Sequence, residues 1–267
     1  IQIIDTTLHN TFNVALRDRV ILSNPTYGAA KLFPPDPKEK TILTPEQVDS
    51  FKRFLRGSSR YYKWYPLIVV FLETMIRGGE LCGIVWDNVD LNNRILTIDH
   101  QLQTKRGKGK DSFYICPPKT KSGKRKIPLT EEAYEAFLLQ KESLAKRNIT
   151  PKFEVDGYRD FVFLTQRGTP NTVVLINQVL KNIAAYYNAD HPNPLPNLSC
   201  HVFRHTGCAI TAKKFFRLGL DPKILQGWMG HSSLKMTLSL YNHVTDDDNK
   251  EAIEMMDLIN RDSTKGA

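Results

Sequence analysis

Residues 200–209, CHVFRHTGCA, place two histidines and an arginine close together with no carboxylate nearby. One face of a helix over this segment is apolar and is expected to pack on the core. The opposite face is expected to be exposed, and it carries His201, Arg204, His205 and Cys208. A zinc site would need a further ligand besides His201 and His205, and no aspartate or glutamate supplies one. The spacing therefore favours binding of an anion over binding of a metal ion.

A second arginine, Arg77, follows a strongly apolar run in the segment ETMIRGGELCGI. Arginine is rarely buried without a partner, and Glu80 is expected on the same helical face three positions later. A buried Arg77–Glu80 ion pair would by itself explain both residues. The alternative is a guanidinium that Glu80 orients and whose planar fork binds a phosphate.

Two further segments could contribute to the same chemistry. Residues 119–126, KTKSGKRK, hold five basic residues and no acid. Residues 225–244, LQGWMGHSSLKMTLSLYNHV, place His231 in a turn after Gly230 and Tyr241 on the helix that follows. Taken alone, such a histidine is more often a capping or core residue, and such a tyrosine more often belongs to the core.

Together these residues predict attack on a phosphodiester. Two guanidiniums, from Arg77 and Arg204, would neutralise the non-bridging oxygens as charge grows on phosphorus, without a metal. A tyrosine hydroxyl has an ordinary pKa of about 10, so Tyr241 would need nearby cations and a base, which His201 could supply. A lysine of the basic segment could protonate the leaving 5′ oxygen.

The composition agrees with an anionic partner but does not require one. Lys and Arg number 37 against 28 Asp and Glu, a formal charge of +9, which favours polyanions or is ordinary solvated charge. The four cysteines lack C-x-x-C spacing, which predicts a reducing cytosol. No apolar run reaches the roughly 18 residues of a membrane span, and no signal peptide is evident. The chain starts without methionine, which favours a fragment of a longer protein.

The hydrophobic pattern predicts a mainly α fold with a small three-stranded antiparallel β-sheet. Helices are expected at 5–21 (capped by Asp5), 43–55 (capped by Thr44), 66–84 with a break at IRGGE, 130–146, 170–188, 200–216, 221–229, 233–243 and 246–260. The strands are expected within 94–103, 113–118 and 124–129. A segment with four prolines, 25–40, reads as a linker, and the single helix before it is too short to form a core.

The ordered set R…K…H-x-x-R…H…Y resembles the tyrosine recombinases, the phage-integrase type of site-specific recombinase. The segments RGGELCGIVWDNVDL, PKTKSGKRKIPLT, HVFRHTGCA and GWMGHSSLKMTLSLYNHV are similar to the family's motifs in the family's order, and HNTFNVALRDRVILSNPT is similar to the last helix of its core-binding domain. Three positions depart from the pattern: Met75 stands where a glycine is usual, and Phe203 and Met229 stand where leucine is usual.

The resemblance implies a role for each matching residue. Arg77 and Arg204 would bind the scissile phosphate, with Glu80 orienting Arg77. The other catalytic residues would be His201 as acid/base, His231 as a phosphate hydrogen-bond donor, Lys121 as general acid and Tyr241 as nucleophile. DNA contacts are expected from Lys119, Lys124 and Arg125, and Lys119 or Lys124 would replace Lys121 if the hairpin register shifts.

The resemblance also implies a domain plan. Residues 1–24 would be the C-terminal remnant of a helical core-binding domain that clamps DNA, 25–40 a linker and 41–244 the catalytic domain. Residues 245–267 would form a C-terminal helix and tail. Two interpretations of this tail stay open: docking on a neighbouring protomer, or packing on its own domain.

The implied function is integration and excision of DNA through a 3′-phosphotyrosine intermediate and a Holliday junction, with no cofactor. The partners would be double-stranded attachment sites and a homotetramer on two sites, a dimer on each, with an excisionase or a host DNA-bending factor as accessory protein and no membrane. The motifs favour a phage or a conjugative transposon in the bacterial cytoplasm, associated with the nucleoid. Two alternatives remain: a nicking and resealing enzyme like type IB topoisomerases, and a DNA-binding regulator of the same fold without catalysis.

Overall fold

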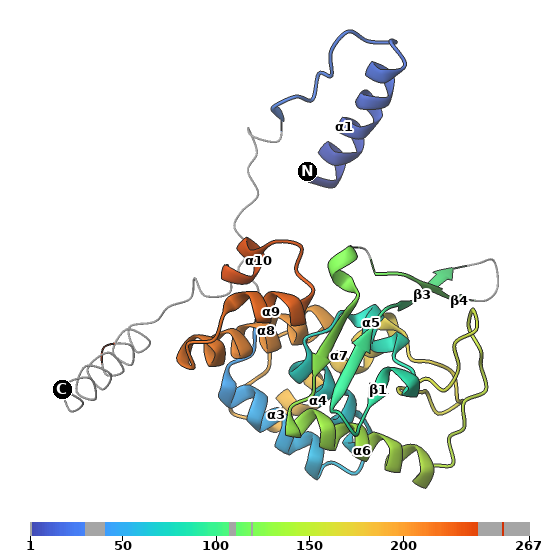
Figure 1. Ribbon diagram of the computed structural model, residues 1–267, viewed down its shortest axis with the longest axis vertical. Coiled ribbons are helices and arrows are strands. Elements are labelled where there is room, and N and C mark those ends of the chain that lie inside the picture. Colours follow the sequence, from blue (N-terminus) through green and yellow to red (C-terminus); the bar gives the residue numbers. More distant parts are fainter. Residues whose placement is uncertain (1, 30–40, 107–110, 119, 240–252, 254–267) are drawn as a thin grey trace. The chain divides into compact units, whose positions relative to one another are not determined.

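The computed structural model describes residues 2–29, 41–106, 111–118, 120–239 and 253 (Figure 1). The chain divides into two compact units, residues 1–40 and 41–267. Lys119, Tyr241 and the predicted helix at 246–260 lie outside the described residues, apart from Ile253. No helix within the described ranges is long and apolar enough to cross a membrane.

The first unit contains helix α1 (Gln2–Arg17). The predicted helix is confirmed, but it begins before Asp5, which lies in its first turn instead of capping it; an acid in that turn still favours the helix because of the helix dipole. Asn24 is buried and donates to the carbonyl of His9 at 3.1 Å and to Asn13 at 2.8 Å, which holds the segment after the helix against α1.

The second unit is mainly helical, as the hydrophobic pattern predicts. Its α-helices are α3 (Pro45–Gly57), α4 (Tyr65–Thr74), α5 (Gly78–Gly83), α6 (Glu131–Lys146), α7 (Val173–Asp190), α8 (Cys200–Arg217), α9 (Pro222–Met229) and α10 (Leu234–Leu238). Short 3-10 helices lie at η1 (Tyr62–Trp64), η2 (Trp86–Asn88) and η3 (Lys121–Gly123). The predicted cap of α3 is confirmed: Thr44 and Gln47 exchange side chain–backbone hydrogen bonds at 3.2 and 3.1 Å.

Helix α4 is the centre of the core. Nearly all of its side chains are buried, and α6 and α8 pack against it. Helix α8 approaches α4 most closely at Gly207, where an added Cβ would overlap the carbonyl oxygen of Leu72. The contact between these helices therefore requires a residue without a side chain. It sets the position of α8, which carries the predicted histidines and Arg204.

The predicted three-stranded antiparallel sheet is present, but its strands are not the three that the sequence indicates. A three-stranded antiparallel sheet has the order β1 (Val89–Asp90), β2 (Ile95–Ile98) and β5 (Arg125–Pro128), and a separate antiparallel pair consists of β3 (Gln101–Arg106) and β4 (Asp111–Cys116). The expected strand at 94–103 is interrupted at Asp99 and His100, and His100 Nε2 lies 2.7 Å from the carbonyl oxygen of Gly83. Strand β1 was missed because two residues carry no periodic signal. The basic segment thus leads from β4 in one sheet to β5 in the other.

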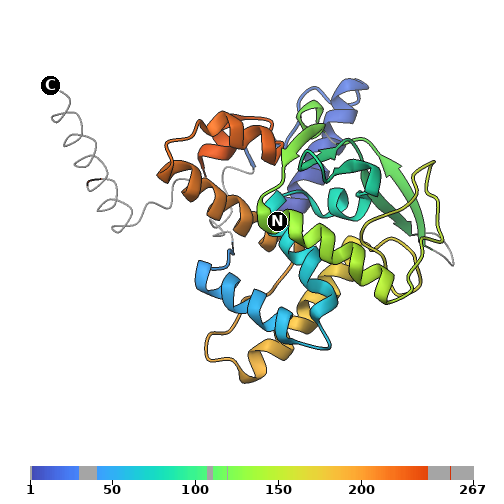
Figure 2. The same cartoon turned by 60° about the horizontal axis from the view of Figure 1, so that its bottom comes forward.

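A second, smaller apolar cluster joins α8 to α9. It consists of Met75, Cys208, Ala212, Phe215, Leu225 and Met229. Figure 2 shows α8, α9 and α10 side by side, in agreement with their contacts. This cluster sets where the C-terminal end of α9 lies relative to α8 and the end of α4.

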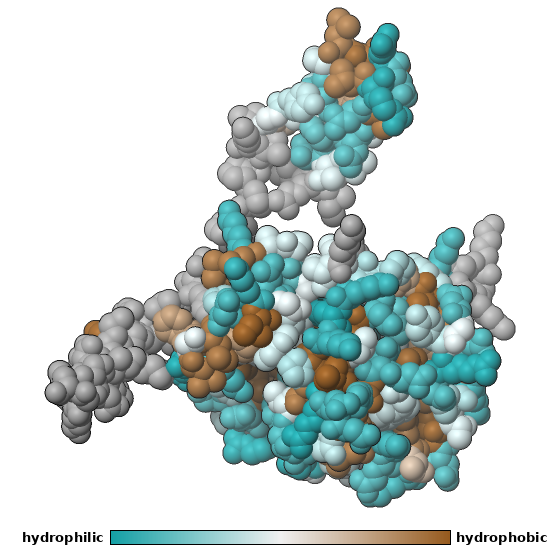
Figure 3. Space-filling view, viewed as in Figure 1, coloured by the Kyte–Doolittle hydropathy of each residue, from teal (hydrophilic) through white to brown (hydrophobic). Residues whose placement is uncertain are grey.

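Large apolar side chains are exposed on α8, α9, α10 and the turn between α8 and α9. They are Phe216, Leu218, Leu220, Ile224, Met236 and Leu238, each 42% exposed or more. Figure 3 shows apolar patches over this part of the second unit. Apolar surface gathered in this way is typical of a contact with another macromolecule.

Replacing Gly207 by Ala should destabilise the second unit by about 1–3 kcal/mol, because the new methyl group overpacks the α4–α8 contact. Gly227→Ala is the matched control: this glycine also lies in a helix, and an added Cβ meets no atom within 4 Å. The control should be neutral or stabilising by about 0.5–1 kcal/mol. Urea unfolding measures both, and equal effects of the two substitutions would refute the close approach.

Candidate active site

Three arginines converge on the C-terminal end of α9. Consecutive backbone carbonyl oxygens there each accept a hydrogen bond from a different guanidinium. The pairs are Arg125 Nε to Trp228 at 2.7 Å, Arg204 Nη2 to Met229 at 2.7 Å and Arg77 Nη2 to Gly230 at 3.2 Å. The last carbonyls of a helix have no partner within the helix and carry partial negative charge. They therefore orient the three guanidiniums without cancelling their formal charges.

Gly230 ends α9 in a left-handed conformation, with φ 63° and ψ 39°. A Cβ at this position would lie 3.0 Å from Arg125 Nη1 and 3.1 Å from the carbonyl oxygen of Ser122. Glycine therefore fits both the backbone turn and the space beside the arginine. His231 follows directly, so the turn also places the predicted histidine beside the arginine cluster.

Glu80 is the carboxylate at the centre of the cluster, and its side chain is 1% exposed. It accepts from Arg77 through the backbone N–H at 2.8 Å and through Nη1 at 2.9 Å. The sequence suggested that Arg77 and Glu80 share a helical face. Arg77 is instead the N-cap residue of α5, and Glu80 in the first turn of that helix accepts hydrogen bonds from it. The predicted Arg77–Glu80 pair exists, and the side chain of Arg77 is 32% exposed.

The burial of Arg125 differs from the prediction. It was expected to contact DNA, but its side chain is 5% exposed. It donates to Glu80 through Nη2 at 2.8 Å and Nη1 at 3.2 Å, and to the carbonyl of Gly123 at 2.9 Å. Because these bonds and the one to Trp228 occupy its donors inside the protein, Arg125 holds β5, Glu80 and α9 together. The strand pattern could have indicated this burial. Side chains alternate between the two faces of β5, so Arg125 lies on the same face as the buried Ile127 two positions later.

The pKa of Glu80 reflects two opposing effects. Burial alone would raise it, but the hydrogen bond and charge of Arg125, followed by the backbone and charge of Arg77, outweigh burial and lower the pKa from its ordinary value of 4.5. Glu80 is therefore ionised in the folded chain at neutral pH. One carboxylate faces three guanidiniums, which leaves the cluster positively charged.

Arg204 is buried, contrary to the prediction of an exposed face. Only 7% of the residue is exposed, and Cys208 on the same face is 1% exposed, because α9 covers this side of α8. Arg204 Nη1 donates to the carbonyl of Met75 at 2.6 Å, in addition to the bond with Met229. Burial lowers the pKa of Arg204, and the charge of Arg77 adds to this effect. The two arginines therefore lie close enough to repel each other.

The carbonyl of Met75 is available because the backbone turns sharply there. Met75 ends α4 in the left-handed region, with φ 53° and ψ 22°. Met75 stands where the motif of the tyrosine recombinases usually has glycine, which adopts a left-handed conformation without strain. The side chain of Met75 is 1% exposed in the apolar cluster between α8 and α9, and this burial offsets the strain of the left-handed backbone.

The two histidines predicted for the site, His201 and His231, and their neighbour His205 occupy different environments. His201 is exposed on the first turn of α8, and its ring stacks at 6.2 Å on that of the half-buried His205. His231 is buried, and its Nδ1 lies 3.1 Å from the hydroxyl of Thr237. Lys121 begins η3, the short helix that precedes β5, and Lys124 is exposed. Lys119 and Tyr241 remain predictions, because they lie outside the described residues.

A comparison with known proteins identifies the class. Residues 41–248 match the model of the phage integrase family. The chain is 36% identical over 242 residues to the transposase from transposon Tn916 of Enterococcus faecalis, and 25% identical over 270 residues to a XerC-like tyrosine recombinase of Caldanaerobacter subterraneus. The chain belongs to the phage integrase family of tyrosine recombinases, as its motifs predict.

The fold agrees with this assignment. A solved structure of the Tn1549 transposon integrase with a circular intermediate DNA matches with a TM-score of 0.80 and 36% identity, over 94% of this chain and 77% of that one. A lambda integrase dimer bound to a core site matches with a TM-score of 0.55 at 16% identity, which shows a shared fold. The chain spans 57% of the length of the Tn916 transposase and 65% of the XerC-like protein.

Arg125→Gln should destabilise the second unit by about 3 kcal/mol, since it removes a partner from the buried Glu80 carboxylate. Arg125→Lys should destabilise the unit less than Arg125→Gln. The ammonium group keeps the positive charge but cannot donate the paired, planar hydrogen bonds of a guanidinium. Lys126→Gln, at the exposed neighbour on β5, removes the same charge and should cost less than about 0.5 kcal/mol. Urea unfolding decides; if Arg125→Gln behaves like Lys126→Gln, the bridging role is wrong.

Glu80→Gln should remove a pH-dependent part of the stability. Because the folded pKa of Glu80 is lowered, its ionised form stabilises the fold above the ordinary value of 4.5, and this contribution is lost as pH falls through the folded pKa. The gap in unfolding free energy between the parent chain and Glu80→Gln should therefore be constant above about pH 5 and narrow below it. Glu131→Gln, at an exposed ion pair with Arg94, should show almost no gap. A Glu80 gap that is unchanged by acid would contradict the assignment.

Proposed function

We propose that this chain contains the catalytic part of an integrase that cleaves and rejoins DNA at attachment sites, without a metal, through a phosphotyrosine on Tyr241. The observation that carries the proposal is the pair of Arg77 and Arg204, oriented by the carbonyls at the end of α9. A cluster with three guanidiniums and one carboxylate suits a phosphate, and the exposed part of Arg77 gives a ligand access.

The proposed step balances without an external energy source. The Tyr241 oxygen forms a bond to phosphorus and the bond from phosphorus to the 5′ oxygen breaks, so one phosphodiester replaces another. His201 takes the tyrosine proton, and Lys121 supplies a proton to the leaving oxygen. Arg77, Arg204 and His231 bind the non-bridging oxygens as their charge increases. The reverse reaction with a different 5′ hydroxyl completes the strand exchange.

Double-stranded DNA is the proposed substrate. The chain carries a formal charge of +9, and Lys124 is exposed beside the site. The similarity to the Tn916 transposase, and to a Tn1549 integrase solved with a circular intermediate DNA, supports integration and excision of a mobile element, with a conjugative transposon favoured over a phage. The expected place of action is the bacterial nucleoid in the cytoplasm.

The domain plan and the assembly belong to the same proposal. Residues 1–24 would end a helical DNA-clamping domain, 25–40 would link it to the catalytic domain at 41–244, and four copies would act on two sites. The exposed apolar face of α8, α9 and α10 supports contact between protomers, with residues 245–267 as one candidate partner segment. An excisionase or a host DNA-bending protein would control direction.

A DNA substrate nicked near the cleavage site tests the chemistry. Incubated with EDTA, the chain should form an adduct with DNA that survives denaturation, because the proposed link is covalent and needs no metal. Tyr241→Phe should abolish the adduct, whereas Tyr186→Phe, at an exposed tyrosine of α7, should not. An adduct that persists in Tyr241→Phe, or that forms only with magnesium, would refute the mechanism.

Arg204→Lys tests the phosphate-binding role separately. Lysine keeps the buried charge but cannot bond two carbonyls and a phosphate through one fork. Cleavage should fall by about 100-fold or more, whereas DNA affinity in a gel-shift assay should change by only a few fold. Equal loss of binding and cleavage would contradict a role of Arg204 in the cleavage step, and absence of cleavage in the parent chain would favour the non-catalytic regulator. Joining of two separate DNA sites would distinguish a recombinase from a topoisomerase-like enzyme.

A further inference from the structure

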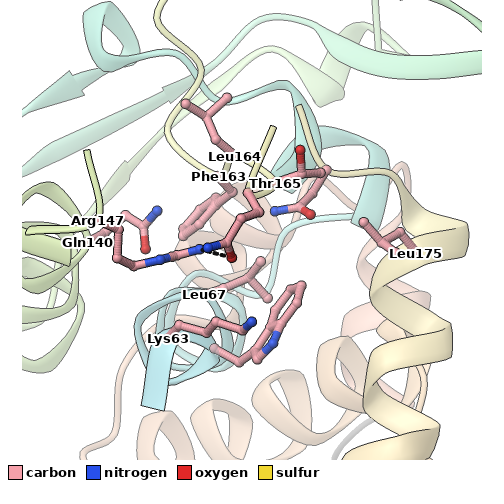
Figure 4. A pocket seen from close by; sticks show the side chains of 11 residues that line it. Lys63, Leu67, Gln140, Arg147, Phe163, Leu164, Thr165 and Leu175 are labelled. Carbon is pink, nitrogen blue, oxygen red and sulfur yellow. Dashed lines mark hydrogen bonds between the residues drawn. The ribbon is translucent and has the colours of Figure 1, made fainter. Parts of the chain in front are cut away.

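A cavity of about 130 Å³ lies between η1, the C-terminal part of α6, residues 163–166 and the start of α7 (Figure 4). None of the residues assigned to the recombinase site lines it. An engineered protein cavity of about 150 Å³ is known to hold one benzene ring. The cavity in this chain therefore has room for a single six-membered ring.

The amide of Asn171 lines this cavity, and its oxygen has no hydrogen-bond partner in the described part of the chain. Asn171 is 3% exposed, and its Oδ1 has no partner among the described residues, although its backbone N–H bonds the carbonyl of Phe163 at 3.0 Å. Buried polar side chains nearly always find hydrogen-bond partners, because an unpaired buried polar group destabilises the fold. An amide offers an acceptor beside a donor, so its complement is a planar edge that also has one of each. Nucleobases present such edges.

The walls of the cavity suit a flat ring. Leu67, Phe163 and Leu164 are buried apolar side chains that line it, and Figure 4 shows Leu67 and Phe163 close together there. The half-buried indole of Trp64 lines the same space. Stacking of a base on an aromatic face contributes a large share of the affinity of a small ligand.

Positive charge lies beside the amide. Lys63 and Arg147 line the cavity and also an adjoining open groove of about 370 Å³, where Arg60 and Lys146 join them. In the described part of the chain neither Lys63 nor Arg147 forms an ion pair with a carboxylate, whereas Lys146 pairs with Glu142 at 2.7 Å. Arg147 Nη2 donates to Gln166 Oε1 at 3.3 Å, the dashed line in Figure 4. The remaining charge suits a phosphate.

We propose that this cavity binds a pyrimidine nucleoside monophosphate. The ring lies between Trp64 and the apolar wall, its hydrogen-bonding edge meets the amide of Asn171, and the phosphate lies at the mouth on Lys63 and Arg147. The volume favours a pyrimidine over the two fused rings of a purine. Cytosine and uracil both offer a donor beside an acceptor, so the amide accepts either by its own orientation.

Isothermal titration of the DNA-free chain with CMP and UMP tests the ligand class. Either pyrimidine nucleotide should bind at least tenfold more tightly than AMP, cytidine or inorganic phosphate, because only it satisfies the ring, the amide and the cations together. Equal binding of inorganic phosphate would reduce the cavity to a simple anion site and overturn the proposal. Saturable binding of neither CMP nor UMP at about 1 mM, a binding free energy of about 4 kcal/mol, would do the same.

Two pairs of variants test the residues. Asn171→Leu keeps the size of the side chain and removes the amide, so CMP affinity should fall about tenfold; Asn182→Leu, at an exposed amide within α7, should leave it unchanged. Lys63→Gln should weaken CMP binding about fivefold, and Lys181→Gln, an exposed lysine with the same change of charge, should not. Because no DNA is present, the result does not depend on the recombinase proposal. If neither Asn171→Leu nor Lys63→Gln changes the affinity for CMP, the nucleotide binds elsewhere and the proposal is wrong.

Discussion

The hydrogen bonds from three arginines to the C-terminal carbonyls of α9 are the interaction on which the rest of the site depends. Arg77 comes from the turn before α5, Arg125 from β5 and Arg204 from α8, so three separate segments meet at one helix end. Each bond satisfies a carbonyl that the helix itself cannot. Any shift of α9 would therefore move all three guanidiniums and His231 together. The apolar cluster between α8 and α9 prevents such a shift because it is tightly buried.

Electrostatic balance explains why the cluster both folds and remains able to bind an anion. Three guanidiniums this close would repel one another, and Glu80 offsets only part of that charge. Backbone dipoles supply the remaining stabilisation without adding a negative charge. A second carboxylate would stabilise the free protein more, but it would compete with the proposed phosphate ligand. The chain thus folds with positive charge that is oriented and not neutralised.

Much of the fold follows from local patterns. The helices of the second unit follow from apolar spacing and caps such as Thr44 with Gln47, and the family follows from the order of its motifs. The sheets were less predictable, because the expected strand is interrupted where His100 bonds the carbonyl of Gly83, and this contact joins residues 17 positions apart. The exposure of Arg204 was mispredicted for a related reason. A helical wheel separates an apolar from a polar face but does not show that α9 covers the polar one.

By itself, the sequence determined which side chains could act on a phosphodiester and the helices and turns that carry them, since capping, periodicity and glycine placement are local properties. The tertiary structure decided how those side chains are held. Arg125 was expected on the DNA-facing surface, but it bonds Glu80 and Trp228 from the interior, 45 and 103 positions away along the chain. Met75 adopts a left-handed turn because its side chain is buried between helices that are distant in sequence. The contacts that orient the arginines join segments far apart in the chain, and no local pattern specifies which carbonyl each guanidinium will meet.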